Sequence, residues 1–327
     1  MIRTENLTRD FGNNRGVFNL SLGVKAGEIF GFIGPNGSGK TTTIKALCGL
    51  LRPTSGKAFI NNITVCPRNI STIRKLIGYM PDKFGVYDQM SVWEYLDFFC
   101  AAYRIPSKER RRRVDEVLDL TEAGYMLDYQ VGSLSHGMTK RIGLARTLLH
   151  DPEVVILDEP ANGLDPNGRI DMRRMILRLK EHGKTILLSS HILPELSSIC
   201  DRVGIIEKGR LLSSGTVKEI TASLQEEMQL SVLVSGRTEA AADLCRDFPN
   251  VKTVSFEGNE IRVVFDGTRG EVAVLNKRLN DAGFAVIGLR EEEADLEQAF
   301  LKVTGRSAEE TPVKPAAAPG ERGAKKA

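Results

Sequence analysis

Residues 34–41 read Gly-Pro-Asn-Gly-Ser-Gly-Lys-Thr, a glycine-rich turn that ends in a cation and a hydroxyl. Without a Cβ in the way, consecutive backbone N–H groups can point inward around an anion. The N-terminus of a following helix adds partial positive charge at the same place. In such a loop Lys40 reaches the β- and γ-phosphates of a nucleotide, and the Thr41 hydroxyl binds Mg²⁺. The predicted cofactor-binding residues of the loop are Gly34, Asn36, Gly37, Ser38, Gly39, Lys40, Thr41 and Thr42.

Two adjacent carboxylates, Asp158 and Glu159, follow the apolar run at residues 154–157. Charged groups at the exit of a buried strand are costly unless they have a function. We expect Asp158 to hold Mg²⁺ through water, and Glu159 to orient and deprotonate an attacking water. The alternative is a plain acidic turn at the end of a strand, and the phosphate loop upstream makes that alternative less favoured.

These residues need elements that position them, and the chain supplies a suitable pattern. Over residues 1–220, short apolar runs alternate with helical patterns, which is typical of an α/β layer with a largely parallel sheet. A strand over 28–33 enters the glycine-rich turn, and a helix over 41–50 follows it, closed by Gly49 and broken by Pro53. The pattern predicts further helices over 91–120, 136–150 and 167–182, and strands over 154–157, 184–189 and 202–207.

The rest of the chain predicts a small α+β domain over residues 226–304 and a tail over 305–327. The domain carries no chemical motif. The tail is rich in Pro, Ala, Gly, Lys and Glu and has almost no large apolar residue, so we expect it to be disordered. Within the domain we expect strands over 229–234, 253–256, 261–265 and 286–289, and helices over 238–247, 270–282 and 295–303.

Composition and charge narrow the class of protein. The 327 residues carry a formal net charge of +3, a mild balance that argues against a dedicated nucleic-acid binder. No apolar run approaches the roughly 18–20 residues that span a bilayer, and the N-terminus does not resemble a secretion signal. We therefore expect a cytoplasmic chain, in which the five scattered cysteines are reduced, mostly buried thiols.

Further motifs resemble those of the ATP-binding cassette (ABC) ATPases. Residues 134–138, Leu-Ser-His-Gly-Met, resemble the LSGGQ signature of that family, and residues 162–166 look like its D-loop. His191 matches the switch histidine, and Phe11 falls where the family places an aromatic ring on adenine. The resemblance covers roughly residues 2–220, and the order of its elements is highly specific.

The resemblance implies a P-loop NTPase core with antiparallel β and helical subdomains, which uses ATP and Mg²⁺. Lys40, Glu159 and His191 are then the catalytic residues, with His191 on the γ-phosphate. Ser135 and Gly137 begin a helix whose free N–H groups meet the ATP of the opposite subunit. Each nucleotide lies between two chains of a homodimer or pseudo-dimer, which ATP closes and hydrolysis releases.

The same resemblance implies a separate transmembrane permease as partner, with this chain peripheral on the inner face of the cell membrane. The C-terminal domain looks like that of exporter-type members, which favours export. The alternatives are a non-transport ABC-type ATPase and an ATP-gated regulatory module. The single phosphate loop and the uninterrupted residues 41–134 argue against the non-transport types, and the full set of catalytic residues argues against the regulatory module.

Two positions depart from the family pattern. Asp82 stands where the Q-loop usually has Gln; both offer an oxygen to Mg²⁺, but Asp is shorter and adds negative charge near the phosphates. We expect Asp82 to contact the metal and the nucleotide through water, and its more plausible role is coupling to the membrane partner rather than catalysis. His136 stands where the signature usually has Gly, and it crowds the start of the helix.

Two surface features admit more than one interpretation. The basic run at residues 108–113 reads as the solvated start of a helix or as a contact for anionic lipid head groups. The aromatic residues between 85 and 99 read mainly as core, with the remainder forming a groove for a helix of the permease. Phe11 is equally plausible chemically as a stacking ring and as a buried ring at the end of a strand.

Overall fold

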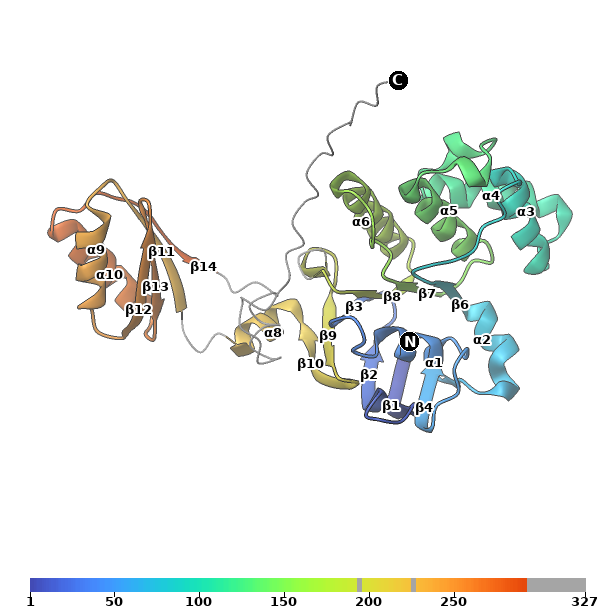
Figure 1. Cartoon of the computed structure of the whole chain (residues 1–327), viewed down its shortest axis with the longest axis horizontal. Helices are drawn as coiled ribbons and strands as arrows, with labels where there is room; N and C mark the ends of the chain where they lie inside the picture. The colour runs from blue at the N-terminus through green and yellow to red at the C-terminus, as the bar shows by residue number, and fades with distance from the viewer. Residues whose placement is uncertain (193–195, 225–227, 293–327) are drawn as a thin grey trace, which may run out of the picture.

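The computed structural model describes residues 1–192, 196–224 and 228–292. At its centre lies a six-stranded sheet in the order β10-β9-β3-β8-β7-β6 (Figure 1). The pairs from β9 to β6 are parallel, and β10 joins the edge as an antiparallel strand. The bounds are β3 Ile29–Ile33, β6 Ile77–Met80, β7 Val154–Asp158, β8 Thr185–Ser190, β9 Arg202–Glu207 and β10 Arg210–Thr216.

Both faces of this sheet are covered, which explains the uninterrupted apolar runs in its strands. Every residue of β3, β7 and β8 is buried. In β3, Ile29 and Ile33 enter the core on one side of the sheet, whereas Phe30 and Phe32 enter the core on the other. The strands therefore hold the two halves of this part of the chain together.

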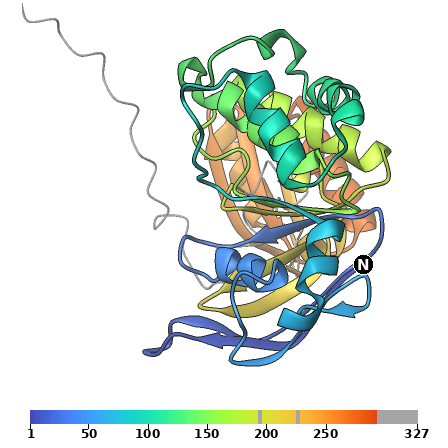
Figure 2. The same cartoon turned by 90° about the vertical axis from the view of Figure 1, so that its right-hand side faces the viewer.

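One face of the central sheet carries an antiparallel sheet in the order β2-β1-β4-β5, with helix α1 (Lys40–Leu47) between them (Figure 2). Its strands are β1 Ile2–Asp10, β2 Gly16–Val24, β4 Ser55–Ile60 and β5 Ile63–Thr64. Apolar residues of these strands pack with Ile44 and Leu47 of α1 and with Phe30 of β3. Helix α2 (Ile70–Leu76) leads from this sheet to β6.

The other face carries a helical layer, with α3 at Val92–Ala102, α4 at Ser107–Leu120, α5 at His136–Leu148 and α6 at Pro166–Glu181. The region expected to be helical over 91–120 consists of two helices, because the chain turns between α3 and α4. Arg104 has a left-handed φ of 61°, and Pro106 disfavours helical backbone in the residue before it. Helix α3 begins at a capping box in which Ser91 and Glu94 bond each other's backbone.

Strand β10 and helix α8 (Val217–Leu224) were not predicted, and they complete this part of the chain. Residues 228–292 then form a second unit with the order β-α-β-β-α-β, and its antiparallel sheet runs β12-β13-β11-β14, a ferredoxin-like arrangement. Its elements are β11 Met228–Val234, α9 Thr238–Arg246, β12 Val251–Glu257, β13 Glu260–Phe265, α10 Arg269–Asp281 and β14 Val286–Glu292.

The second unit has its own hydrophobic core, which includes Leu230, Val232, Ile261 and Leu275. The predicted fold class, an α/β P-loop core with a small C-terminal α+β domain, is confirmed. The helix expected at 295–303 and the tail at 305–327 lie outside the described residues.

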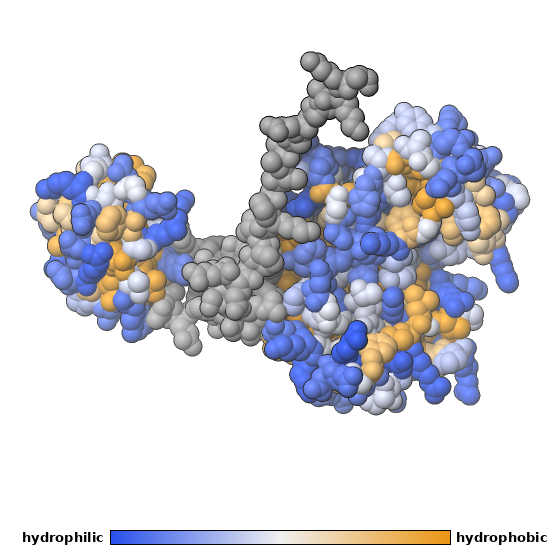
Figure 3. All heavy atoms as spheres, in the orientation of Figure 1, coloured by the Kyte–Doolittle hydropathy of each residue, from blue (hydrophilic) through white to orange (hydrophobic). Residues whose placement is uncertain are grey.

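The visible face of the molecule is mostly hydrophilic, with apolar side chains in small patches (Figure 3). Among the residues that the structure describes, no helix is both long and apolar enough to cross a membrane. The cysteines of the chain are free thiols, and Cys48 and Cys100 are buried as expected.

Candidate nucleotide-binding site

The glycine-rich loop lies between the end of β3 and the start of α1, as the sequence predicts. Gly37 and Gly39 have φ values of 82° and 111°, a left-handed region that suits glycine. A Cβ on Gly34 would collide with the carbonyl oxygen of Ile206. The loop can therefore wrap closely around an anion at the N-terminus of α1 only because these positions are glycine.

Lys40 is the first residue of α1, and its side chain is buried. Its Nζ donates to the carbonyl oxygens of Gly34 at 2.6 Å and Pro35 at 3.3 Å. It also forms an ion pair with Glu159 Oε1 at 3.1 Å. These contacts bring the lysine of the loop and the carboxylate after β7 to one place, although they lie 119 positions apart in the sequence.

Asp158 is the last residue of β7, and two hydroxyls donate to its Oδ1 atom. Thr41 Oγ1 lies 3.1 Å away and Ser189 Oγ lies 2.7 Å away. A carboxylate beside a hydroxyl is a donor set that Mg²⁺ accepts when phosphate and water complete its coordination. Among the described residues, no group of three or more His, Cys, Asp or Glu side chains could hold a metal without such help.

Glu159 has an unusual backbone for a side chain of its size, with φ of 50°. Its N–H donates to Ser189 Oγ at 3.0 Å, so this buried serine holds both acidic residues. His191 Nδ1 lies 2.8 Å from Glu159 Oε2. The glutamate thus has Lys40 on one oxygen and His191 on the other. Sequence reasoning missed Ser189, since a serine in a strand carries no local signal of such a role.

The loop itself contributes a second polar group. Ser38 Oγ is buried and makes no hydrogen bond within the described part of the chain. An unbonded buried hydroxyl is costly unless a ligand completes it. Asn36 and Gly37 are exposed beside it, and Thr42 is half-buried in the first turn of α1. This arrangement fits the phosphate groups of a nucleotide.

Asp82 follows β6, and its carboxylate bonds residues other than the predicted metal ligands Thr41 and Asp158. Its Oδ1 accepts from Lys140 Nζ at 3.3 Å and from Asn162 Nδ2 at 3.1 Å. The sequence singled out Asp82 as a metal contact and did not foresee these two partners.

The signature residues lie at the start of α5. Ser135 is the N-cap, and its hydroxyl accepts from the N–H of Met138 at 3.3 Å. His136 Nε2 lies 3.2 Å from the carbonyl oxygen of Asn162 in the D-loop. A side chain on Gly137 would meet only Leu164, at 3.8 Å. Ser135 and His136 are exposed, and Gly137 is partly so, as a contact for another molecule requires.

Phe11 lies just beyond β1 and is 54% exposed. The Arg9 guanidinium lies over its ring, 4.8 Å from the ring centroid. The buried alternative for Phe11 is therefore wrong, and an exposed ring remains available for stacking on a base.

Two weak acids near Asp158 stay protonated. Burial raises the pKa of the Cys48 thiol, and the Asp158 carboxylate raises it further. Burial and then Asp158 likewise raise the pKa of the Tyr79 hydroxyl. Neither group is therefore a nucleophile or base at neutral pH.

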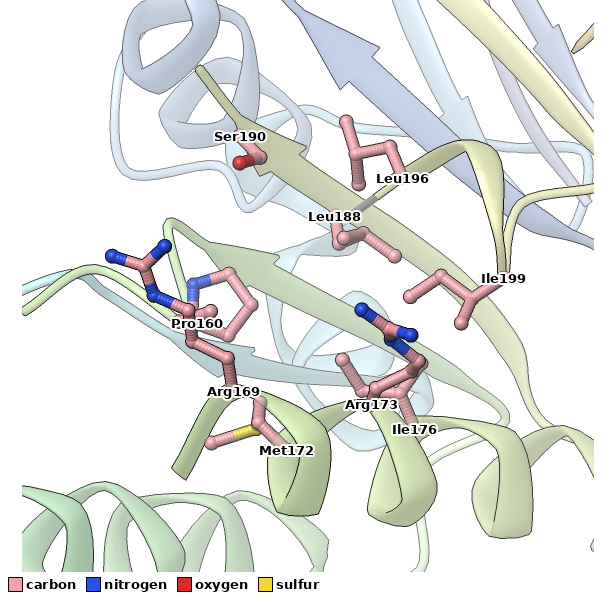
Figure 4. Close-up of a pocket in the computed structure, with 10 residues that line it drawn as sticks. Pro160, Arg169, Met172, Arg173, Ile176, Leu188, Ser190, Leu196 and Ile199 are labelled. Carbon is pink, nitrogen blue, oxygen red and sulfur yellow. The ribbon is translucent and has the colours of Figure 1, made fainter. Parts of the chain in front are cut away.

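A separate small pocket lies between α6 and β8 (Figure 4). Met172 and Ile176 of α6 face Leu188 of β8 across it, and Leu196 and Ile199 close it. Arg169 and Arg173 of α6 also line this otherwise mainly apolar pocket.

Comparisons with known proteins show relatives of this chain in one family. The family described as ABC transporter matches residues 17–162. The bacitracin transport ATP-binding protein BcrA of Bacillus licheniformis is 36% identical over 306 residues, 93% of this chain and 97% of that protein. An uncharacterized ABC transporter ATP-binding protein of a Synechocystis strain is 36% identical over 285 residues, 86% of this chain and 77% of that protein.

Solved structures give the same result. An ATP-binding subunit of an ABC transporter superposes with a TM-score of 0.61 at 29% identity, over 68% of this chain and 92% of that one. A dimeric bacterial ABC transporter cassette superposes with a TM-score of 0.59 at 26% identity, over 66% of this chain and 98% of that one.

Proposed function

The chain belongs to the ATP-binding proteins of the ABC transporter family, and from this membership we propose that it hydrolyses Mg-ATP in order to drive export through a separate permease. The observation that carries the proposal is the meeting of Lys40, Glu159 and His191 at the end of the central sheet. Glu159 has one oxygen 3.1 Å from Lys40 Nζ and the other 2.8 Å from His191 Nδ1.

Each residue has a role that follows from its position. Lys40 and the N–H groups before α1 bind the phosphates, with Ser38 as a further donor. Glu159 orients a water and takes its proton, and His191 holds the same carboxylate and contacts the γ-phosphate. Thr41 and Asp158 would hold Mg²⁺, which neutralises charge on the phosphates when bound. Asp82 stays a predicted contact of the metal.

A second copy of the chain completes the nucleotide-binding site. The N-terminus of α5, capped by Ser135, carries free N–H groups that suit a phosphate. Gly137 leaves room for its approach, and Phe11 stacks on the adenine. Ser135 contacts Met138 in its own chain, whereas Lys40 contacts Gly34, Pro35 and Glu159. The similarity to a dimeric cassette supports a homodimer or pseudo-dimer.

The partner is a transmembrane permease, and the chain works peripherally on the cytoplasmic face of the membrane. Support comes from the similar bacitracin transport protein and from exposed rings on the helical layer. Tyr87 and Phe98 are 49% and 43% exposed and pack edge to face, 5.4 Å apart, beside the buried Tyr95. Such a ring pair suits an apolar helix of the permease.

The organisation expected from the sequence supports the same proposal. We place the ATPase domain at 1–220, the accessory domain at 226–304 and the tail at 305–327. The ferredoxin-like sheet and its separate core support the second of these domains.

The test is Glu159→Gln, which removes the proton acceptor and keeps the shape of the side chain. We expect ATP turnover with Mg²⁺ to fall by roughly 10²–10⁴-fold. Binding of a fluorescent ATP analogue, measured without hydrolysis, should be unchanged. A variant that hydrolyses at the wild-type rate contradicts the role of Glu159.

The same variant tests assembly. Because it binds ATP without turnover, it should form a dimer on adding Mg-ATP, measured by light scattering. Tagged and purified from solubilised membranes with Mg-ATP, it should retain a protein with several membrane spans. Without Mg-ATP-dependent dimers, or without such a companion, the transport part of the proposal fails.

A further inference from the structure

A buried lysine on α5 lies behind the catalytic glutamate. The side chain of Lys140 is only 2% exposed. Its Nζ donates to the carbonyl oxygen of Asp82 at 2.8 Å, to Asp82 Oδ1 at 3.3 Å and to the carbonyl oxygen of Glu159 at 3.4 Å. An ammonium has three N–H donors and no acceptor, so these three oxygens account for all its hydrogen bonds.

The charge of this lysine is balanced by Asp82. A buried ammonium is costly unless a carboxylate lies close to it. Asn162 Nδ2 donates to the same Oδ1 atom at 3.1 Å, which fixes the carboxylate on its other side. Asp82, Lys140 and Asn162 belong to the loop after β6, to α5 and to the D-loop. The cluster therefore ties together three segments that border the nucleotide site.

The backbone of Glu159 is held by hydrogen bonds at both its N–H group and its carbonyl oxygen. A left-handed backbone at a residue with a side chain costs free energy and persists only where the surroundings hold it. On the N–H side, Ser189 Oγ accepts at 3.0 Å. On the carbonyl side, the donors are the N–H of Asn162 at 3.1 Å and the ammonium of Lys140. Lys140 is the charged member of this support.

We propose that Lys140 is a positioning residue for ATP hydrolysis, which fixes the backbone of Glu159 while Asp82 supplies its counter-charge. This inference rests on the proposed role of Glu159. It also assigns a purpose to the acidic residue at position 82, where the family usually has an amide. An amide would leave the ammonium without a neutralising charge, so Lys140 and Asp82 act as a pair.

The test compares Lys140→Met, Asp82→Asn and the double variant with the wild type in steady-state ATP hydrolysis, below the melting temperature of each protein. For Lys140→Met we expect kcat to fall roughly 10- to 100-fold, because a displaced catalytic group costs rate. KM for ATP should change less than about threefold, since the Lys140 ammonium donates to Asp82 and Glu159 and not to the phosphate loop in the described part of the chain. A residue that only stabilises the fold would lower the melting temperature and leave kcat unchanged.

The double variant tests the pairing. It contains neither buried charge, so its loss of kcat should be smaller than the product of the two single losses, and its melting temperature should exceed that of Lys140→Met. If Lys140→Met does not fold, the effect of removing Lys140 is measured instead by comparing kcat of the double variant with kcat of Asp82→Asn. The matched control is Lys184→Met. Lys184 is also largely buried, with 16% of its side chain exposed, and its Nζ forms an ion pair with Asp151 at 2.7 Å. The kcat of this control variant should equal that of the wild type.

Two results overturn the inference alone: a wild-type kcat in Lys140→Met, or single losses that multiply in the double variant. Both require a wild type that hydrolyses ATP. A wild type without hydrolysis overturns the proposed function and the positioning role together, so the two failures are told apart by the first measurement.

Discussion

Ser189 shows how one small side chain can organise two charged neighbours. Its hydroxyl donates to Asp158 and accepts from the N–H of Glu159, and it is fully buried. A hydroxyl can do both at once because it carries one donor and two acceptor lone pairs. The carboxylate proposed to hold Mg²⁺ and the carboxylate proposed to activate water are thereby fixed by one side chain.

Replacing this serine should damage both stability and rate. In Ser189→Ala the buried N–H of Glu159 loses its acceptor, so we expect the free energy of unfolding to fall by about 1–3 kcal/mol. ATP turnover should fall roughly tenfold or more, because Glu159 is less well placed. Chemical denaturation and steady-state hydrolysis measure the two effects. Ser71→Ala, at an exposed position of α2, is the control and should change neither; a wild-type rate in Ser189→Ala would argue against this role.

At the residue scale, site residues that belong to a local sequence motif could be predicted from the sequence. Site residues that are distant in sequence and meet only in the folded chain could not. Lys40 and Thr41 are recognisable because their spacing from the glycines is fixed by local backbone geometry. Lys140 and Asp82 are 58 positions apart, and Asn162 and Asp82 are 80 positions apart. No local pattern reports such pairs, so the cluster was found only in the structure.

At the scale of elements, the junction between α5 and β7 is held by His150. Its Nε2 bonds the carbonyl oxygen of Ile77 at 2.9 Å, and its ring stacks on Tyr103 with centroids 4.2 Å apart. Burial lowers the pKa of His150, and the bond to Ile77 opposes that shift. His150 is therefore held neutral between the helical layer and the central sheet.

The sign of the pH effect follows from this shift. Because the folded pKa of His150 lies below the unfolded value of about 6.5, its contribution to stability is complete above that pH and is lost as pH falls. We expect the melting temperature of the wild type to fall from pH 7 to pH 5 more than that of His150→Gln. Gln keeps a donor for Ile77 and does not titrate. Parallel falls in the two proteins would contradict the prediction.

Elements with strong periodicity were easier to predict than weakly patterned ones. The strands β3, β7 and β8 are fully buried and each contains a run of apolar residues, and their expected ranges agree with the structure to within about a residue. Strand β10 was missed because its residues are half-exposed and rich in serine and glycine. The turn between α3 and α4 was not located within the region expected to be helical, because Arg104 carries no signal of a left-handed backbone.

At the scale of the whole molecule, the described cores divide the chain. The two cores of the larger part extend from Ile2 to Ile220, and the third lies between Leu230 and Leu279. No residue belongs to both groups within the described part of the chain. A unit with its own core can in principle fold alone.

We therefore expect a fragment of residues 1–224 to fold and bind ATP. It keeps Ile220, which packs in the larger core from α8. Its melting temperature should rise on adding Mg-ATP by an amount similar to that in the full chain, measured by differential scanning fluorimetry. A fragment that aggregates, or that melts without responding to ATP, would mean that the C-terminal unit is part of the cassette.

Strand β3 leads directly into the phosphate loop and contributes side chains to both hydrophobic cores of the larger part of the chain. Ile29 and Ile33 pack in one core, and Phe30 and Phe32 pack in the other. A displacement of β3 would therefore disturb the packing of both cores. A ligand bound where this strand ends consequently braces both layers at once. We therefore expect a bound triphosphate to slow hydrogen exchange in the antiparallel sheet and in the helical layer together.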